Sequence, residues 1–265
     1  MDTKVERVAE LERANYAASQ AIAQVTSSLE VLLRDDVIIM SSQLFPMPDT
    51  NNACLLRAAP QTADNLIAEV IDHFGSKGLP ATIFISPACT PADLGERLLS
   101  RGFVKQEEEE AWLVLDDLLH FTVPAVNFPI AIRQITPDEV SMFAAVFMAA
   151  FEMPVEFAPY MAQFMEPWIG LPGVHHYIAF AGEEPVGTAS LICHEHFGIL
   201  GSCGVVPAHR RSGAATNLAI KAVVDAQNQG ADTLMLQTTA GTFLERLLRT
   251  YGFKKVFTRT CYTLS

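Results

Sequence analysis

The sequence predicts an α+β fold (mixed α/β) in two tandem domains, each a mixed, mostly antiparallel sheet flanked by helices. Three observations indicate this class. Runs typical of strands alternate along the chain with apolar residues at helical spacing. In the second half, three strand-like runs joined by short turns are typical of an antiparallel meander. The pattern Glu-Arg-Leu-Leu with a closing Gly-Phe occurs twice, at residues 96–103 and 245–253, a domain length apart, which indicates a duplicated fold.

The first half begins with apolar residues at helical spacing between Val5 and Leu32, which predicts one or two amphipathic helices. Residues 44–52 hold two prolines and two asparagines and are typical of a loop. The other elements expected in this half are strands at 36–41, 53–58 and 81–86, helices at 63–74 and 91–100, and a strand at 111–115.

Four consecutive glutamates occupy residues 107–110. A solvated hairpin turn is the favoured interpretation, and a binding surface for a cationic partner is the alternative. Residues 116–129 include Pro124 and Pro129 and predict an extended, stiff connection. The expected organisation is an N-terminal domain over residues 1–120, a linker over 121–129 and a C-terminal domain over 130–265.

The second half opens with a strand at 130–135. Thr136, followed by Pro137 and by Glu139, has the capping-box pattern that starts a helix, here expected to run to about residue 151. Residues 153–172, rich in aromatic residues, methionine and proline, predict a helix and a loop. Their apolar side chains either pack inward, which is the favoured interpretation, or line a pocket for a hydrophobic acceptor. The elements that follow are strands at 176–181, 185–193 and 197–206, a helix at 214–229, a strand at 233–238 and a helix at 244–253.

The segment 205–215, Val-Val-Pro-Ala-His-Arg-Arg-Ser-Gly-Ala-Ala, joins a strand to the following helix. Its last four residues have very small side chains, so a bulky anion can reach their backbone N–H groups. The first N–H groups of a helix have no intrahelical acceptor and carry partial positive charge, and two arginines add groups suited to phosphate oxygens. The segment predicts a phosphate cradle. The alternative is an ordinary strand–turn–helix corner with two solvated arginines.

The core of this segment, Arg210, Gly213 and Ala215, resembles the acetyl-CoA pyrophosphate loop of the GNAT superfamily of N-acyltransferases, whose pattern is Arg/Gln-x-x-Gly-x-Gly/Ala. The strand before it, the helix after it and the final Gly-Phe helix match as well. The resemblance covers about the last half of the chain. The first half has no such loop between its strand at 53–58 and its helix at 63–74, so we expect a degenerate GNAT-like copy that supports the structure or shapes the substrate cleft.

The resemblance implies that acetyl-CoA binds with its pantetheine arm between the two parallel strands, against the backbone of the first. Gly201 and Gly204 fit a bulged strand with free N–H groups, one of which can stabilise the oxyanion formed during acyl transfer. The cofactor-binding residues that the resemblance implies are Cys203, Gly204, Val205, Val206, Arg210, Arg211, Ser212, Gly213, Ala214, Ala215 and Thr238.

Direct acyl transfer needs a base that deprotonates the ammonium group of the acceptor and a proton for the leaving thiolate. His194, Glu195 and His196 lie at a turn beside the cofactor strand, and Glu195 is assigned as the candidate base, with a solvated turn residue as the alternative. No metal site is predicted, because the two histidines lack an obvious third ligand. Lesser candidates for the base are Glu152, His175 and His176.

The helix at 244–253 departs from the family pattern. Many members place a tyrosine, the general acid, four residues before the glycine of the closing Gly-Phe, where this chain has Leu248. A frequent CoA-contacting asparagine falls on Gly241. Tyr251 is the candidate that substitutes as the acid. Transfer without an acid is slower but still chemically feasible.

Composition restricts the partners. The formal net charge of −12 argues against nucleic acid, which needs a broad basic surface, and suits a basic amine substrate. The five cysteines are odd in number and lack C-x-x-C spacing, which favours reduced thiols. The start is charged without an apolar signal region, and no stretch is apolar and long enough to span a bilayer. We therefore expect a cytoplasmic protein with no membrane partner.

The resemblance thus implies an N-acetyltransferase that moves an acetyl group from acetyl-CoA to a primary amine by direct attack in a ternary complex. The acceptor is a small-molecule or peptide amine, and a homodimer is one assembly open to the protein. The alternative is a catalytically weak or inactive acyl-CoA-binding or regulatory module, motivated by Leu248 and Gly241. A mononucleotide site is remote, because neither G-x-x-x-x-G-K-[ST] nor G-x-G-x-x-G occurs.

Overall fold

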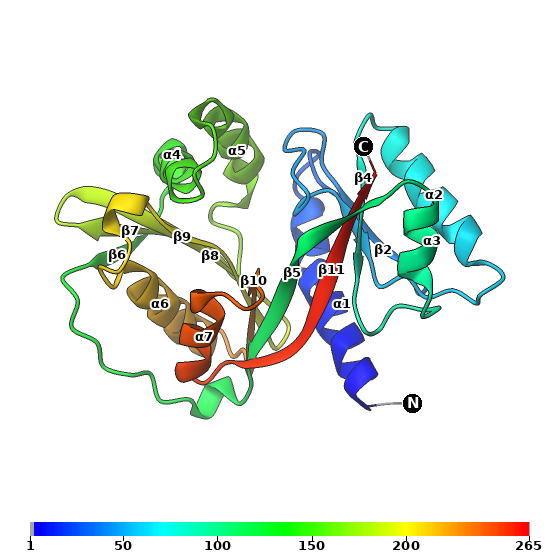
Figure 1. The fold of residues 1–265 in the computed structure, drawn as a ribbon. Coiled ribbons are helices and arrows are strands. Elements are labelled where there is room, and N and C mark those ends of the chain that lie inside the picture. Colours follow the sequence, from blue (N-terminus) through cyan, green and yellow to red (C-terminus); the bar gives the residue numbers. More distant parts are fainter. Residues whose placement is uncertain (1–2, 265) are drawn as a thin grey trace. The chain divides into compact units, whose positions relative to one another are not determined.

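The computed structural model describes residues 3–264 of the chain. They form two compact units. Unit 1 contains the described residues up to Val114 and from Gln237 onward, and unit 2 contains Leu115–Leu236. Each unit has a mixed sheet flanked by helices (Figure 1), and the predicted α+β class is confirmed.

Unit 1 has the strand order β1-β2-β3-β4-β11-β5. Neighbouring strands are antiparallel except β3 and β4, which are parallel and joined through α2. Helices α2 and α3 lie on one face of this sheet and α1 lies on the other (Figure 1). The elements are α1 (Thr3–Ala23), β1 (Glu30–Leu33), β2 (Ile38–Ser41), β3 (Asn52–Cys54), α2 (Ala63–Gly75), β4 (Ala81–Ile85), α3 (Leu94–Ser100), β5 (Val104–Leu115), α7 (Phe243–Thr250) and β11 (Lys254–Leu264).

The core of unit 1 lies between the sheet and helices α2 and α3. Phe74 of α2, Ile83 of β4 and Leu98 of α3 are fully buried in one hydrophobic cluster. Phe103, which follows α3, and Tyr262 of β11 belong to the same cluster. Segments from the first and last parts of the chain therefore build one core, and its burial of apolar surface holds them together.

Unit 2 has the strand order β10-β9-β8-β7-β6, antiparallel except for the parallel pair β9 and β10. Helices α4 and α5 lie on one face and α6 on the other (Figure 1). The elements are β6 (Ala131–Gln134), α4 (Val140–Ala150), α5 (Ala158–Met165), β7 (Val174–Ala181), β8 (Glu184–His194), β9 (Phe197–Val205), α6 (Ala214–Asn228) and β10 (Thr233–Thr239), whose last residues are grouped with unit 1. The predicted meander is β7-β8-β9.

The division into units differs from the expected boundaries, which placed residues 130–265 in one domain. Residues 237–265 fall with the first part of the chain instead. The physical reason is β11, which pairs with β4 on one side and with β5 on the other. These backbone hydrogen bonds fix the last strand inside the sheet of unit 1.

The two Gly-Phe motifs end their helices in the same way. Gly102 has a φ of 89° and Gly252 has a φ of 95°, the left-handed conformation that glycine provides at a helix C-terminus. Phe103 and Phe253 then turn inward and are 3% and 5% exposed. The repeat seen in the sequence is thus also a repeat of local structure.

Two expectations about unit 1 are corrected. Glu107 to Glu110 do not form a hairpin turn but lie within β5, where Glu109 and Glu110 are in register with β11. The strand expected at 53–58 is shorter, because Leu55 adopts a φ of 51°, which ends the extended conformation after Cys54.

The capping box at Thr136 is confirmed, since the Thr136 N–H donates to Glu139 Oε2 at 3.0 Å. Among the helices within residues 3–264, none combines the length and apolar character needed to cross a lipid bilayer.

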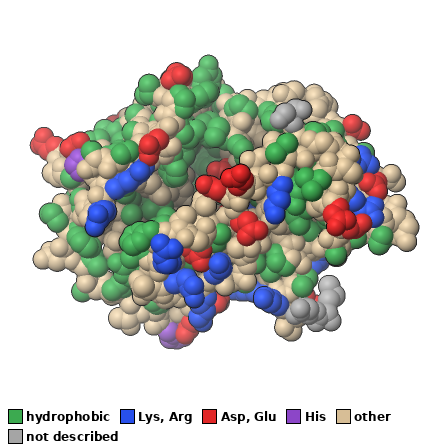
Figure 2. Space-filling model, in the orientation of Figure 1, with side chains coloured by type: hydrophobic (Ala, Val, Ile, Leu, Met, Phe, Trp, Pro, Cys, Tyr) green, Lys and Arg blue, Asp and Glu red, His purple; other side chains and the backbone are tan. Residues whose placement is uncertain are grey.

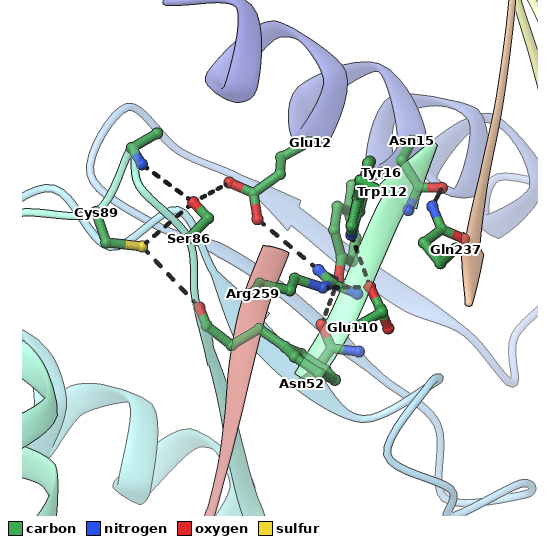
Figure 3. A network of polar contacts seen from close by, with 12 residues as sticks. Glu12, Asn15, Tyr16, Asn52, Ser86, Cys89, Glu110, Trp112, Gln237 and Arg259 are labelled. Carbon is green, nitrogen blue, oxygen red and sulfur yellow. Dashed lines mark hydrogen bonds and ion pairs between the residues drawn. The ribbon is translucent and has the colours of Figure 1, made fainter. Parts of the chain in front are cut away.

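A buried polar network in unit 1 joins α1, β5 and β11 (Figure 3). Arg259 of β11 is 6% exposed, and its Nε donates to Glu110 Oε1 at 2.6 Å. Its Nη1 donates to the Tyr16 hydroxyl at 3.2 Å, and its guanidinium lies 3.9 Å from the centre of the Phe84 ring. A buried cation needs such partners, because an uncompensated charge in the interior is costly.

Glu12 of α1 faces the same network and is fully buried. Its Oε2 accepts from Ser86 Oγ at 2.7 Å, whereas its Oε1 has no hydrogen-bond partner among the described residues and lies 3.8 Å from Arg259 Nη1. Burial raises the pKa of Glu12 to about 7, and the charge of Arg259 opposes this rise. Folded protein therefore keeps the Glu12 proton at pH values where the unfolded chain has lost it.

This proton makes the stability depend on pH. We expect the free energy of unfolding of the wild type to fall relative to that of Glu12→Gln as the pH rises from 4.5 to 7, because the pKa is about 7 when folded and 4.5 when unfolded. The change across this window is about 3 kcal/mol. Urea titrations at several pH values measure it.

The matched control is Glu10→Gln, on the same helix, which removes an exposed carboxylate paired with Arg7. Its stability should run parallel to the wild type across the window. A Glu12→Gln profile that also runs parallel to the wild type contradicts the buried-proton account.

Candidate functional site

Strand β9 carries the predicted β-bulge. In its pairing with β8, Gly201 lies opposite Ser190 and Gly204 lies opposite Thr188, so β9 has one extra residue between these pairs. Ser202 adopts a left-handed φ of 52°, and Thr188 Oγ1 donates to the Ser202 carbonyl at 2.9 Å. The bulge bends the strand and interrupts its hydrogen-bond ladder.

The parallel pairing of β9 with β10 ends at Leu200 and Leu236, although β9 continues to Val205. Beyond Leu200, the described partner of β9 in unit 2 is β8 alone. Cys203 and Gly204 lie in this part of the strand. Their backbone therefore lies beyond the last residue of β9 that pairs with β10, which is where the resemblance implies that the pantetheine arm binds.

Two of the expected strand residues have features that restrict what they can contribute. The Val206 N–H donates to the Val186 carbonyl at 2.9 Å, so this group is already used within unit 2. Burial raises the pKa of the Cys203 thiol to about 11. At neutral pH the thiol is protonated and is a poor nucleophile, so its side chain does not provide an acyl-accepting thiolate.

The predicted phosphate cradle has the geometry of a helix N-terminus behind a left-handed glycine. Gly213 is the N-cap of α6, with a φ of 91°. The Ala214 N–H donates to Ser212 Oγ at 3.4 Å, and the first helical hydrogen bond runs from the Asn217 N–H to the Gly213 carbonyl at 3.0 Å. Ala215 and Thr216 lie between Ala214 and Asn217, and their N–H groups therefore have no intrahelical acceptor.

The two arginines of the motif have different surroundings. Arg210 is turned toward the end of α4, where its Nη2 donates to the Ala150 carbonyl at 3.3 Å and to Glu152 Oε1 at 2.5 Å. Arg211 is exposed, adopts a φ of 70°, and has no side-chain hydrogen bond or ion pair within unit 2. Arg211 is thus the arginine whose guanidinium group an incoming anion can bind without displacing another group.

Phe128, from the predicted linker, packs on the loop. A Cβ added to Gly213 would lie 2.2 Å from Phe128 Cγ, so the ring covers the glycine directly. The linker is fixed further by Asn217 Nδ2, which donates to the Ile130 carbonyl at 2.9 Å. The sequence analysis missed this contact. The available signal was an apolar aromatic residue near the end of the linker, but the linker also holds Phe121, so the sequence alone does not single out Phe128.

This packing makes Gly213 sensitive to substitution. We expect Gly213→Ala to lower the free energy of unfolding by about 1–3 kcal/mol, because alanine is strained at a φ of 91° and its Cβ meets the Phe128 ring. Chemical denaturation measures the loss.

Gly230→Ala is the control, since Gly230 has a φ of 81° but nothing within 4 Å of an added Cβ. It reports the backbone cost alone. In a Phe128→Ala background, Gly213→Ala should cost about as much as Gly230→Ala. An equal cost in the presence and absence of the Phe128 ring contradicts the direct contact.

The region between α4 and β7 contains both core and surface. Met161, Phe164 and Met165 are at most 5% exposed, as the favoured interpretation requires, whereas Phe157 and Tyr160 are 42% and 51% exposed. In Figure 2 hydrophobic side chains gather over α4 and α5. The apolar side chains of this region therefore pack inward along one side of α5, whereas two aromatic rings are exposed to solvent.

The structure does not bring Glu195 together with the cradle. Glu195 is exposed, adopts a φ of 52° and lies in the turn before β9, whereas the cradle follows the end of that strand. With a rise of about 3.3 Å per residue, Phe197 and Gly204 are about 23 Å apart along β9. The base role of Glu195 stays a prediction that this geometry does not favour.

Two lesser candidates for the base, His175 and His176, lie on β7 and are partly or fully buried. His176 of β7 is 2% exposed, its Nδ1 lies 2.8 Å from Ser190 Oγ, and burial lowers its pKa to about 4, so it is neutral at pH 7. His175 is half-buried with Nδ1 3.2 Å from Gln134 Oε1. Within residues 3–264, no group of three or more His, Cys, Asp or Glu side chains is arranged to hold a metal ion.

The residues implied for the last helix all lie in unit 1. Leu248, at the position of the family's tyrosine, is buried, and Tyr251 follows the end of α7. Gly241 has a φ of 75°, and its N–H donates to Glu245 Oε2 at 2.7 Å, so it forms the turn that starts α7. Thr238 lies near the end of β10.

An open pocket of about 470 Å³ lies in unit 1 between β5 and the turn before α7. Its lining residues are Lys105, Glu107, Glu108, Glu109, Thr239, Ala240, Gly241 and Thr242. The carboxylates that the sequence placed in a hairpin turn thus line an acidic pocket.

Comparison with known proteins identifies the class. Residues 142–253 match the model of the Acetyltransferase (GNAT) family, and this segment includes the phosphate loop. The match confirms the predicted resemblance of the second half of the chain to the GNAT family. A search of curated proteins finds no match to the sequence.

Solved structures share the fold over nearly the whole chain. A GCN5-related N-acetyltransferase from Kribbella flavida is 15% identical with a TM-score of 0.70, covering 95% of each chain. A tandem GNAT protein from the clavulanic acid biosynthesis pathway is 15% identical with a TM-score of 0.60, covering 99% of this chain and 94% of that one. A GCN5-related N-acetyltransferase from Sphaerobacter thermophilus is 15% identical with a TM-score of 0.59, covering 95% and 90%. The chain therefore has the fold of these proteins, a tandem GNAT protein among them.

Proposed function

We propose that the chain is an N-acetyltransferase that moves an acetyl group from acetyl-CoA to a primary amine by direct attack in a ternary complex. The observation that carries the proposal is a combination within unit 2. The bulged end of β9 is unpaired on one side, and the strand leads into a helix whose first N–H groups lie behind the left-handed Gly213. Such a strand and helix terminus suit an extended arm that ends in a pyrophosphate.

The residues present fit acetyl-CoA. The free N–H groups at the start of α6 and the Arg211 guanidinium would hold the pyrophosphate, and the small side chain of Ala215 leaves room for it. The backbone of Cys203 and Gly204 would hold the pantetheine arm. When bound, acetyl-CoA supplies the activated acyl group as a thioester.

The chain's own contribution to the chemistry is binding and polarisation by backbone groups. An N–H group of the bulged part of β9 can donate to the thioester carbonyl oxygen and stabilise the oxyanion that forms when the amine attacks. The protonated Cys203 thiol favours direct attack over an acyl-cysteine route. The net charge of −12 supports a basic amine as the acceptor.

The alternative function is binding of acyl-CoA without efficient turnover. It is favoured by Leu248, a buried side chain that cannot donate a proton, at the position where many family members have the acid. The two functions share the cofactor site and differ only in turnover. Experiments on binding and on turnover therefore separate them.

We expect acetyl-CoA to stabilise the wild type but not Ala215→Glu. A ligand at a hundred times its Kd stabilises the native state by about 2.7 kcal/mol, which is a clear rise in Tm. A carboxylate in the first turn of α6 is compatible with the helix dipole but repels the phosphates. Thermal unfolding with increasing acetyl-CoA measures both proteins.

Ala215→Gln is the matched control, with the same side-chain size and no charge. Its bulk fills part of the space that Ala215 leaves for the pyrophosphate, so it should lose part of the rise in Tm, and the further loss in Ala215→Glu is the effect of the charge. If the wild type shows no rise at millimolar acetyl-CoA, the cofactor assignment is wrong.

We expect turnover to depend on Tyr251 if this residue supplies the proton for the leaving thiolate. In a screen of primary amines with detection of free CoA thiol, Tyr251→Phe should release thiol about 100-fold more slowly than the wild type. Its Tm should rise with acetyl-CoA as in the wild type. Equal rates contradict the acid role, and acetyl-CoA binding without thiol release for any amine supports the alternative function.

A further inference from the structure

The end of helix α4 contacts the motif arginine and the cofactor strand together. Arg210 Nη2 donates to the Ala150 carbonyl and to Glu152 Oε1. A Cβ on Gly204 would come within 2.7 Å of the Phe151 ring and 3.0 Å of the Ala150 Cβ, so glycine at this position allows α4 to pack closely on β9. The three residues at the end of α4 thus contact both the cradle arginine and the strand expected to hold the cofactor arm.

Glu152 occupies an unusual conformation for its type. Its φ is 55°, in the left-handed region that glycine or asparagine normally provides at the end of a helix. Its side chain is 63% exposed and that of Arg210 is 51% exposed. An ion pair in such surroundings contributes little to folding stability, so stability does not explain why a strained glutamate stands here.

Arg210 is one of the two arginines of the predicted phosphate cradle whose guanidinium groups suit phosphate oxygens, and here a carboxylate already binds it. A carboxylate and a phosphate oxygen make the same charge-assisted hydrogen bonds to a guanidinium group. A phosphate that takes this nitrogen must displace the Glu152 carboxylate, and it approaches against the negative charge of Glu152.

We infer that Glu152 sets the affinity of the cofactor site by competing with the phosphate groups of CoA for Arg210. The inference rests on the proposed function. Binding of CoA exchanges the carboxylate for phosphate, which frees Glu152 at the residue where α4 ends. The cofactor site is thereby linked to the segment that leads into α5.

The test compares the Kd for CoA of four proteins by isothermal titration calorimetry. They are the wild type, Glu152→Gln, Arg210→Ala and the double variant. We expect Glu152→Gln to bind CoA about two- to fivefold more tightly than the wild type, because the amide has no charge to compete with phosphate. In the Arg210→Ala background, the same change should have almost no effect on the Kd.

Glu156→Gln is the matched control, because Glu156 is exposed, lies close in sequence and makes no side-chain contact to Arg210. It reports the general effect of removing one negative charge. Thermal unfolding without ligand checks that all variants fold, and a structural role alone would move this Tm rather than the Kd.

The outcomes separate the inference from the proposed function. Tighter binding by Glu152→Gln that exceeds the effect of Glu156→Gln and disappears without Arg210 supports competition. Equal Kd values for the wild type and Glu152→Gln overturn the inference and leave the proposed function intact. An equal gain in both Arg210 backgrounds, or in both glutamate variants, overturns it as well. Absence of CoA binding in the wild type overturns the proposed function and this inference together.

Discussion

The end of backbone pairing between β9 and β10 is the constraint on which the site in unit 2 depends. Backbone N–H and C=O groups in a folded protein need partners, so a strand that loses its neighbour must meet solvent or a ligand. The bulge at Ser202 and the glycines around it let β9 bend there without steric conflict. β9 stays paired with β8 up to Val205, and the loop that leads to α6 begins directly after this residue.

The local parts of this site could be predicted from the sequence. Gly201 and Gly204 indicated a bulged strand, and Gly213 among small residues indicated a helix start open to an anion. These predictions hold because each depends on a few adjacent residues and on the steric freedom of glycine. The fold class could be predicted for the same reason, since strand and helix periodicities are local.

The long-range parts could not be predicted. Phe128 covers Gly213, and Glu152 binds Arg210, although many residues separate the partners in each pair. No periodicity or motif encodes such contacts, because they arise only when helices pack on the sheet. Glu195 shows how closeness in sequence differs from closeness in space. It is close to the cofactor strand in sequence, but a strand has two ends, and the turn that holds Glu195 is at the other one.

Strand β11 has a consequence for how the chain is made. The sheet of unit 1 has a gap between β4 and β5 until residues 254–264 fill it, because β11 pairs with both neighbours. The chain emerges from the ribosome from its N-terminus, and every strand of the meander in unit 2 is complete before β11 exists. The first strands of unit 1 are therefore synthesised before unit 2, but its sheet is complete only after unit 2 has been synthesised. Until β11 is made, the edges of β4 and β5 that it will cover are open to wrong pairing with another chain.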